Sequence, residues 1–107
     1  MALRLIISGG QTGADQGGLH AARRRRVATG GWAPQGFLTE AGPDPALERD
    51  FGLKACEGGY DERTVLNASE ADGTAIFARD TGSNGTRLTL AVLEALGKPY
   101  VLNPTAA

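Results

Sequence analysis

The chain has 107 residues, with 11 Lys and Arg against 12 Asp and Glu, so it carries a formal net charge of −1. This length predicts a single domain over residues 1–107, and the balanced charge gives no general attraction for nucleic acid or for an anionic membrane, neither of which is expected as a partner. With one Cys and one His, the chain is expected to have no internal disulfide framework and no metal site built by protein side chains. It has no long apolar run and no signal peptide, which predicts a cytoplasmic protein.

The first half of the chain begins with an alternation of strand and helix. The apolar run Leu3–Ser8 predicts a strand buried on both faces, followed by a helix over Gly13–Arg25 and a weaker strand over Val27–Trp32. The stretch Pro34–Gly59 is rich in Pro and Gly and lacks periodicity. We therefore expect a long loop there, with one helical turn near Pro45–Arg49.

The second half repeats this alternation. A helix is predicted over Asp61–Glu70 and a strand over Thr74–Ala78. The last helix carries an apolar stripe at helical spacing, formed by Leu88, Ala91, Val92, Ala95 and Leu96. Gly97 is expected to end this helix before a strand over Tyr100–Leu102. Alternating strands and helices predict an α/β fold, with a small, mostly parallel sheet between two layers of helices. A sheet this short favours self-association.

A glycine-rich loop joins the first strand to the first helix. Its candidate ligand-binding residues are Gly9, Gly10, Gln11, Thr12, Gly13 and Asp15. Free N–H groups and the positive end of a helix dipole suit a phosphate, and Asp15 is placed to accept a hydrogen bond from a ribose or a pterin. The alternative, compatible with this one, is that Thr12 caps the helix with Asp15 as its partner.

A second loop of the same kind precedes the last helix. Its candidate ligand-binding residues are Gly82, Ser83, Asn84, Gly85 and Thr86. Ser83 or Asn84 would cap the helix, and a plain structural turn is the alternative. Because both loops follow strands of a parallel sheet, we expect them to meet at one cleft and share an anionic guest.

Three further candidates lie between the loops. Trp32, the only tryptophan, and Pro34 stand in a Gly-rich segment, where Trp32 would stack on a base or pterin ring and Gln35 would contact the ring's edge. Asn67 would point into the same cleft. The alternative for Trp32 is a core or interface position.

These segments together resemble a known family. The runs Ile7–Asp15, Gly30–Pro34, Glu62–Thr64 with Asn67, and Gly97–Tyr100 occur in the order typical of the putative molybdenum carrier family, the circularly permuted YpsA-like branch of the SLOG superfamily. The resemblance covers nearly the whole chain. It implies a Rossmann-like fold that binds a nucleotide-derived ligand or the molybdenum cofactor, commonly as a homo-oligomer, for which we expect a dimer or tetramer.

Two departures from the relatives bear on function. The related phosphoribohydrolases, of the lysine-decarboxylase-like group, carry a Glu where this chain has Thr89, and family members are expected to continue into at least one more strand. We therefore expect a small-molecule binding protein without turnover. The alternatives are a nucleotide-processing hydrolase that uses Asp15, Asp61 or Glu62, and a module that senses or sequesters a nucleotide signal.

Overall fold

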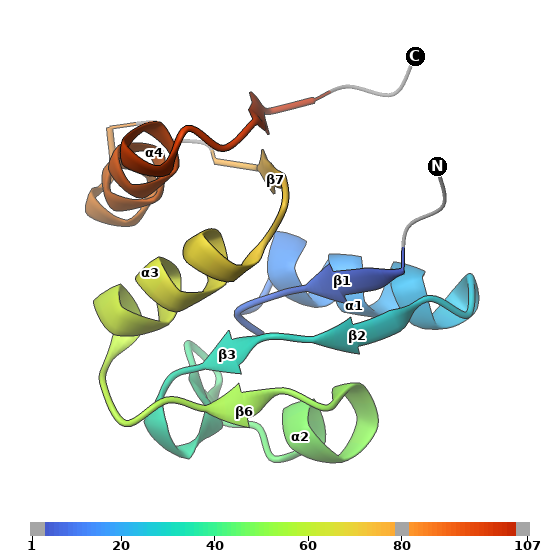
Figure 1. Cartoon of the computed structure of the whole chain (residues 1–107). Coiled ribbons are helices and arrows are strands. Elements are labelled where there is room, and N and C mark those ends of the chain that lie inside the picture. Colours follow the sequence, from blue (N-terminus) through green and yellow to red (C-terminus); the bar gives the residue numbers. More distant parts are fainter. Residues whose placement is uncertain (1–3, 79–81, 105–107) are drawn as a thin grey trace.

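Parallel strand pairs organise the chain, which a computed structural model describes over residues 4–78 and 82–104 (Figure 1). The parallel pairs are β1 (Leu5–Ile7) with β2 (Ala28–Gly30), β3 (Trp32–Ala33) with β6 (Lys54–Ala55), and β7 (Thr74–Ile76) with β8 (Tyr100–Leu102). An antiparallel hairpin joins β4 (Leu38–Thr39) to β5 (Gly42–Pro43). The expected α/β fold with mostly parallel strand pairing is confirmed, but the described strands form four separate two-stranded sheets instead of the single small sheet predicted. Of the predicted segments, only Leu3 at the start of the first strand lies outside the described residues.

Helices and one short 3₁₀ turn connect these strands. They are α1 (Ala14–Arg24), η1 (Gln35–Phe37), α2 (Ala46–Phe51), α3 (Tyr60–Glu70) and α4 (Asn84–Leu96). In Figure 1, α1 lies behind β1 and β2, against which it packs, while α3 packs against β3 and α4. The three long helices predicted from the sequence are confirmed. Among the described residues, no helix has the length and apolar character needed to cross a membrane.

The two faces of β1 meet different helices. Ile6 lines a hollow with Ala22 of α1, whereas Leu5 and Ile7 line another with Glu70 of α3. Because successive side chains of a strand point to opposite faces, α1 and α3 lie on opposite sides of the strands. The prediction that this strand is buried on both faces is wrong, since Leu5 is 49% exposed.

Two separate apolar clusters hold the elements together. One joins α1 and α2 to the strands through Leu19, Ala33, Leu47, Phe51 and Leu53. The other joins α3, α4 and β7 through Ala68, Ile76 and Leu93, with Ala78, Leu90 and Val92 packed against it. The predicted stripe of α4 is therefore largely wrong. The helix is apolar around most of its circumference, so periodicity alone did not identify the packed side.

The stretch predicted as a long loop contains regular structure. It forms η1, the β4–β5 hairpin, α2 and β6 between Pro34 and Gly59. The sequence Lys54–Ala55 lacks the β-branched residues that mark a strand, and only its pairing with β3 makes it one. The single strand expected over Val27–Trp32 is divided at Gly31, whose φ of 124° interrupts it. A Cβ at Gly31 would lie 2.3 Å from the carbonyl oxygen of Ser8, so only glycine fits there.

Lys98 ties the start of the last strand to the end of α3. Its ammonium donates to the carbonyl oxygens of Ser69 and Ala71, the latter at 2.7 Å. These carbonyls belong to the last turn of α3 and to its C-cap residue, Ala71, where a helix leaves acceptors without partners inside the helix. A cation at this end also complements the helix dipole. Lys98 is therefore structural.

We predict that Lys98→Met lowers the free energy of unfolding by about 1–3 kcal/mol, because two helix-end carbonyls lose a charged donor. The measurement is chemical denaturation. Arg87→Met is the matched control, since Arg87 is an exposed cation on α4, and it is expected to change stability by less than about 0.5 kcal/mol. Equal losses in the two variants would contradict the assignment.

Candidate functional site

The first glycine loop starts α1 without a side-chain cap. Gly13, with φ of 88°, is the N-cap residue of α1, so the alternative that Thr12 caps the helix is wrong. The Asp15 carboxylate instead accepts a hydrogen bond from the Gln11 N–H at 3.2 Å. The Gln11 side chain donates to the carbonyl oxygen of Leu38 and so turns towards the hairpin.

Some of the backbone N–H groups of this loop already donate hydrogen bonds within the protein. The Gly10 N–H donates to Ser8 Oγ at 3.2 Å, and the Gln11 N–H donates to Asp15. Residues 12–14 are exposed, and in the described part of the chain their N–H groups make no hydrogen bond. Of the N–H donors predicted for an anion at this loop, only those of residues 12–14, at the positive end of α1, therefore remain available.

Arg63 brings a positive charge from α3 to the same loop. Its Nη1 lies 3.7 Å from Asp15 Oδ2, and its side chain is 16% exposed. The guanidinium crosses Gly9 so closely that a Cβ there would lie 1.9 Å from Nη1. Its Nε is buried and has no hydrogen-bond partner. Arg63 was not among the predicted site residues, although its position one helical turn before Asn67 places both on one face of α3.

Burial raises the pKa of the Asp15 carboxyl. Removal from water raises the pKa of this carboxyl above its ordinary value of 3.8, and the Gln11 N–H and the Arg63 charge oppose that rise only partly. The side chain remains 37% exposed. The folded state thus binds a proton more readily than the unfolded chain, and Asp15 costs stability as pH rises through 3.8 and then through the higher folded value.

Replacing Asp15 by Asn removes this penalty while keeping an oxygen acceptor for the Gln11 N–H. We predict that the stability of Asp15→Asn relative to the natural protein improves between pH 3 and pH 7, as measured by thermal unfolding at both pH values. A variant that loses more stability at pH 7 than at pH 3 would show that the Arg63 ion pair outweighs burial.

Asn67 fixes the backbone of Trp32. Its Oδ1 accepts from the Trp32 N–H and its Nδ2 donates to the Trp32 carbonyl oxygen, both at 2.8 Å. The indole Nε1–H donates to Glu70 Oε2, also at 2.8 Å. Arg63, Asn67 and Glu70 lie on one face of α3. That face therefore contacts the chain just after the end of β1 and at the start of β3.

We predict that Asn67→Ala lowers the free energy of unfolding by about 1–3 kcal/mol, because two partly buried backbone groups lose their partners. Asn84→Ala, at an exposed position, is the control and should change stability by less than about 0.5 kcal/mol. Denaturant titration of both variants provides the comparison. Similar losses would mean that the two hydrogen bonds contribute nothing measurable.

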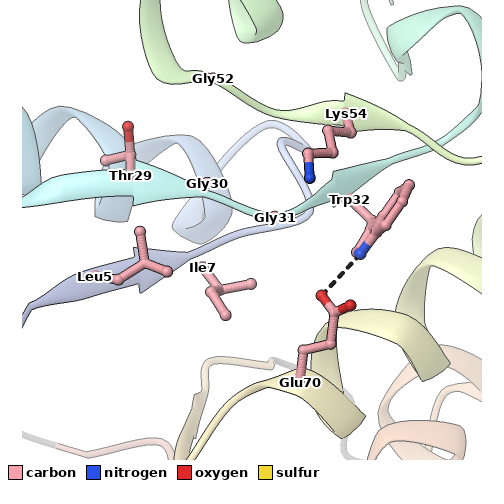
Figure 2. Close-up of a pocket in the computed structure, with 9 residues that line it drawn as sticks. All are labelled: Leu5, Ile7, Thr29, Gly30, Gly31, Trp32, Gly52, Lys54 and Glu70. Carbon is pink, nitrogen blue, oxygen red and sulfur yellow. Dashed lines mark hydrogen bonds between the residues drawn. The ribbon is translucent and has the colours of Figure 1, made fainter.

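The Trp32 side chain lies away from the first glycine loop. It lines a hollow on the face of the sheet. The hollow has a volume of about 300 Å³. Figure 2 shows Lys54 and Glu70 on opposite sides of Trp32, and the ammonium of Lys54 lies 5.6 Å from the indole centroid. No residue of either glycine loop lines this hollow. Pro34 is buried and Gln35 is exposed, and neither lines it.

The main structural role of the second glycine loop is to cap the start of α4. Ser83 is the N-cap residue of α4, and its Oγ accepts from the N–H of Thr86, a buried residue. Gly82, Asn84 and Gly85 are exposed. Between described residues, no hydrogen bond or ion pair joins this loop to the first one. A shared ligand therefore stays a prediction.

The groups at this site are hydrogen-bond donors and one cation rather than metal ligands. Across the described residues, no group of three or more His, Cys, Asp or Glu is arranged to hold a metal ion. Backbone N–H groups and a guanidinium meet at the carboxyl end of β1, where α/β folds commonly bind ligands. The fold and this site define a small α/β protein with backbone N–H donors and a guanidinium at the end of its first strand.

Comparison with known proteins identifies the family. Residues 6–105 match the model of the circularly permutated YpsA SLOG family, so the chain belongs to this family. It is similar to the crystal structure of a putative molybdenum carrier protein from Syntrophus aciditrophicus SB, with 36% identity and a TM-score of 0.84. The match covers 94% of this chain and 63% of that one, so the chain spans less than two thirds of the relative's length. No curated protein matches the sequence significantly.

Proposed function

We propose that the protein binds a phosphate-bearing small molecule, either a nucleotide derivative or the molybdenum cofactor, and acts as a carrier. The ligand's phosphate would lie at the carboxyl end of β1, on the N–H groups of residues 12–14 and beside Arg63. The proposed function includes no chemical reaction.

The observation that carries this proposal is the unsatisfied Arg63. A buried guanidinium N–H without an acceptor costs about 1–3 kcal/mol, and the ion pair with Asp15 at 3.7 Å is too long to be a hydrogen bond. An incoming phosphate oxygen would supply that acceptor. The glycine at position 9 keeps the guanidinium close to the loop, because any side chain there would displace it.

The donor set also suits the molybdenum cofactor or molybdate. The phosphate of the cofactor and the tetrahedral molybdate ion are both oxyanions, which N–H groups and a guanidinium bind. The solved relative's name, a putative molybdenum carrier protein, supports this ligand class. The protein would hold the oxygen atoms of such a ligand, and in the described part of the chain no cluster of side chains is placed to bind the metal itself.

The hydrolase alternative gains no specific support. Thr89 stands where the related hydrolases carry a Glu, and its Oγ1 donates to the carbonyl oxygen of Gly85 within α4. The protein is also proposed to self-associate. The support is that all three residues of β8 are exposed, with Val101 53% exposed, so the strand offers an unpaired surface. The proposed location is the cytoplasm, whose reducing conditions suit the free thiol of Cys56.

We predict that Arg63→Gln weakens binding of inorganic phosphate, AMP and molybdate by about 10-fold or more, since a charged hydrogen bond is worth about 1.5–3 kcal/mol. Isothermal titration calorimetry measures each affinity. Arg24→Gln, at the opposite end of α1, is the matched control and should change affinity by less than about 2-fold. Equal affinity in the natural protein and Arg63→Gln would reject the site, as would no binding of any of the three.

A further inference from the structure

The hollow beside Trp32 is built from parts that suit a flat ring. Gly30, Gly31 and Gly52 contribute only backbone to its lining, and at Gly30 the absence of a side chain leaves the sheet face open (Figure 2). A Cβ at Gly30 would meet only Leu5 Cδ1, at 3.7 Å. The indole of Trp32 forms one wall. A planar group of nucleobase size can lie on this open face against the indole, since aromatic rings favour such contacts.

Opposite charges stand at the two sides of the hollow. Lys54 reaches in from β6 and Glu70 from α3 (Figure 2). Neither makes an ion pair with another described residue. One oxygen of Glu70 accepts from the Trp32 indole, which fixes the carboxylate and leaves its other oxygen available. The hollow thus has an anionic acceptor and a cationic donor among its lining residues.

We infer that this hollow binds a planar heterocycle that presents N–H donors next to a carbonyl oxygen, as guanine and pterins do. The N–H groups of such a ring donate to Glu70, and its carbonyl oxygen accepts from Lys54. Adenine lacks this pattern, because it presents an amino group where guanine has the carbonyl. The inference stands apart from the anion site, since no residue of either glycine loop lines the hollow.

Trp32 gives a direct readout, because it is the only tryptophan of the chain. Titration of the full chain with guanosine is expected to change the Trp32 fluorescence in a saturable way, with a dissociation constant below about 1 mM. Adenosine is expected to bind about 10-fold more weakly, the cost of one unmade charged hydrogen bond. Neither nucleoside carries a phosphate, so this titration does not depend on Arg63.

Two variants test the geometry. Gly30→Val fills the open face and should abolish the guanosine response, while Glu70→Gln keeps an acceptor for the indole and should remove the preference for guanosine over adenosine. Glu94→Gln, an exposed acid on α4, is the control and should leave both responses unchanged. Thermal unfolding of each variant establishes that it is folded.

Three results would overturn the inference: no saturable response to guanosine, equal responses to both nucleosides, or full binding by folded Gly30→Val. A Trp32 signal that follows protein concentration and ignores nucleosides would mean that a second copy of the chain covers the hollow. Failure of inorganic phosphate to bind, measured separately by calorimetry, affects only the proposed function.

Discussion

The polar face of α3 is the constraint on which the site depends. Asn67 replaces a neighbouring strand by pairing with both backbone groups of Trp32, which fixes α3 against the start of β3. With the helix so placed, Arg63 reaches Gly9 and Asp15 on one side, and Glu70 reaches the indole on the other. One helix face thereby positions the charges of two distinct regions, the loop after β1 and the hollow beside Trp32.

The glycines make this arrangement possible at particular points. Gly9 leaves room for the guanidinium of Arg63, and Gly31 lets β3 approach Ser8 more closely than any side chain allows. Both positions lie next to the polar face of α3. The high glycine content of the chain, 16 residues, thus has a local explanation at the site, because the helix packs directly on backbone there.

Much of the fold could be predicted from the sequence, because apolar runs and helix-ending residues are local signals. The Gly97 that ends α4 adopts the left-handed conformation expected of it, with φ of 65°. The strand Lys54–Ala55 could not be predicted, since its residues have no strand preference and its partner β3 lies far away in sequence. The side of α4 that packs against α3 and β7 could not be predicted from the sequence either, because that helix is apolar on several sides.

In the candidate site too, features with a local sequence signal could be predicted, and features that depend on contacts between distant segments could not. The glycine loops were found because glycine after an apolar run is a local signal, and family resemblance agreed with it. Arg63 lies in the run Glu62–Thr64 that carries the family resemblance, but it was not predicted as a site residue, since an arginine at the start of a helix is ordinarily solvated. Its burial depends on α3 crossing the end of β1. The engagement of Asn67 with Trp32 likewise required the two segments to be brought together.

The most direct test of the central claim is a phosphate titration of isotope-labelled protein followed by amide NMR. The account predicts that the Arg63 Nε–H and the backbone N–H signals of residues 12–14 shift together, with a single dissociation constant, while the internally bonded N–H of Gly10 shifts least. Saturable binding that leaves Arg63 Nε–H unchanged, or that shifts only signals elsewhere in the chain, would contradict it.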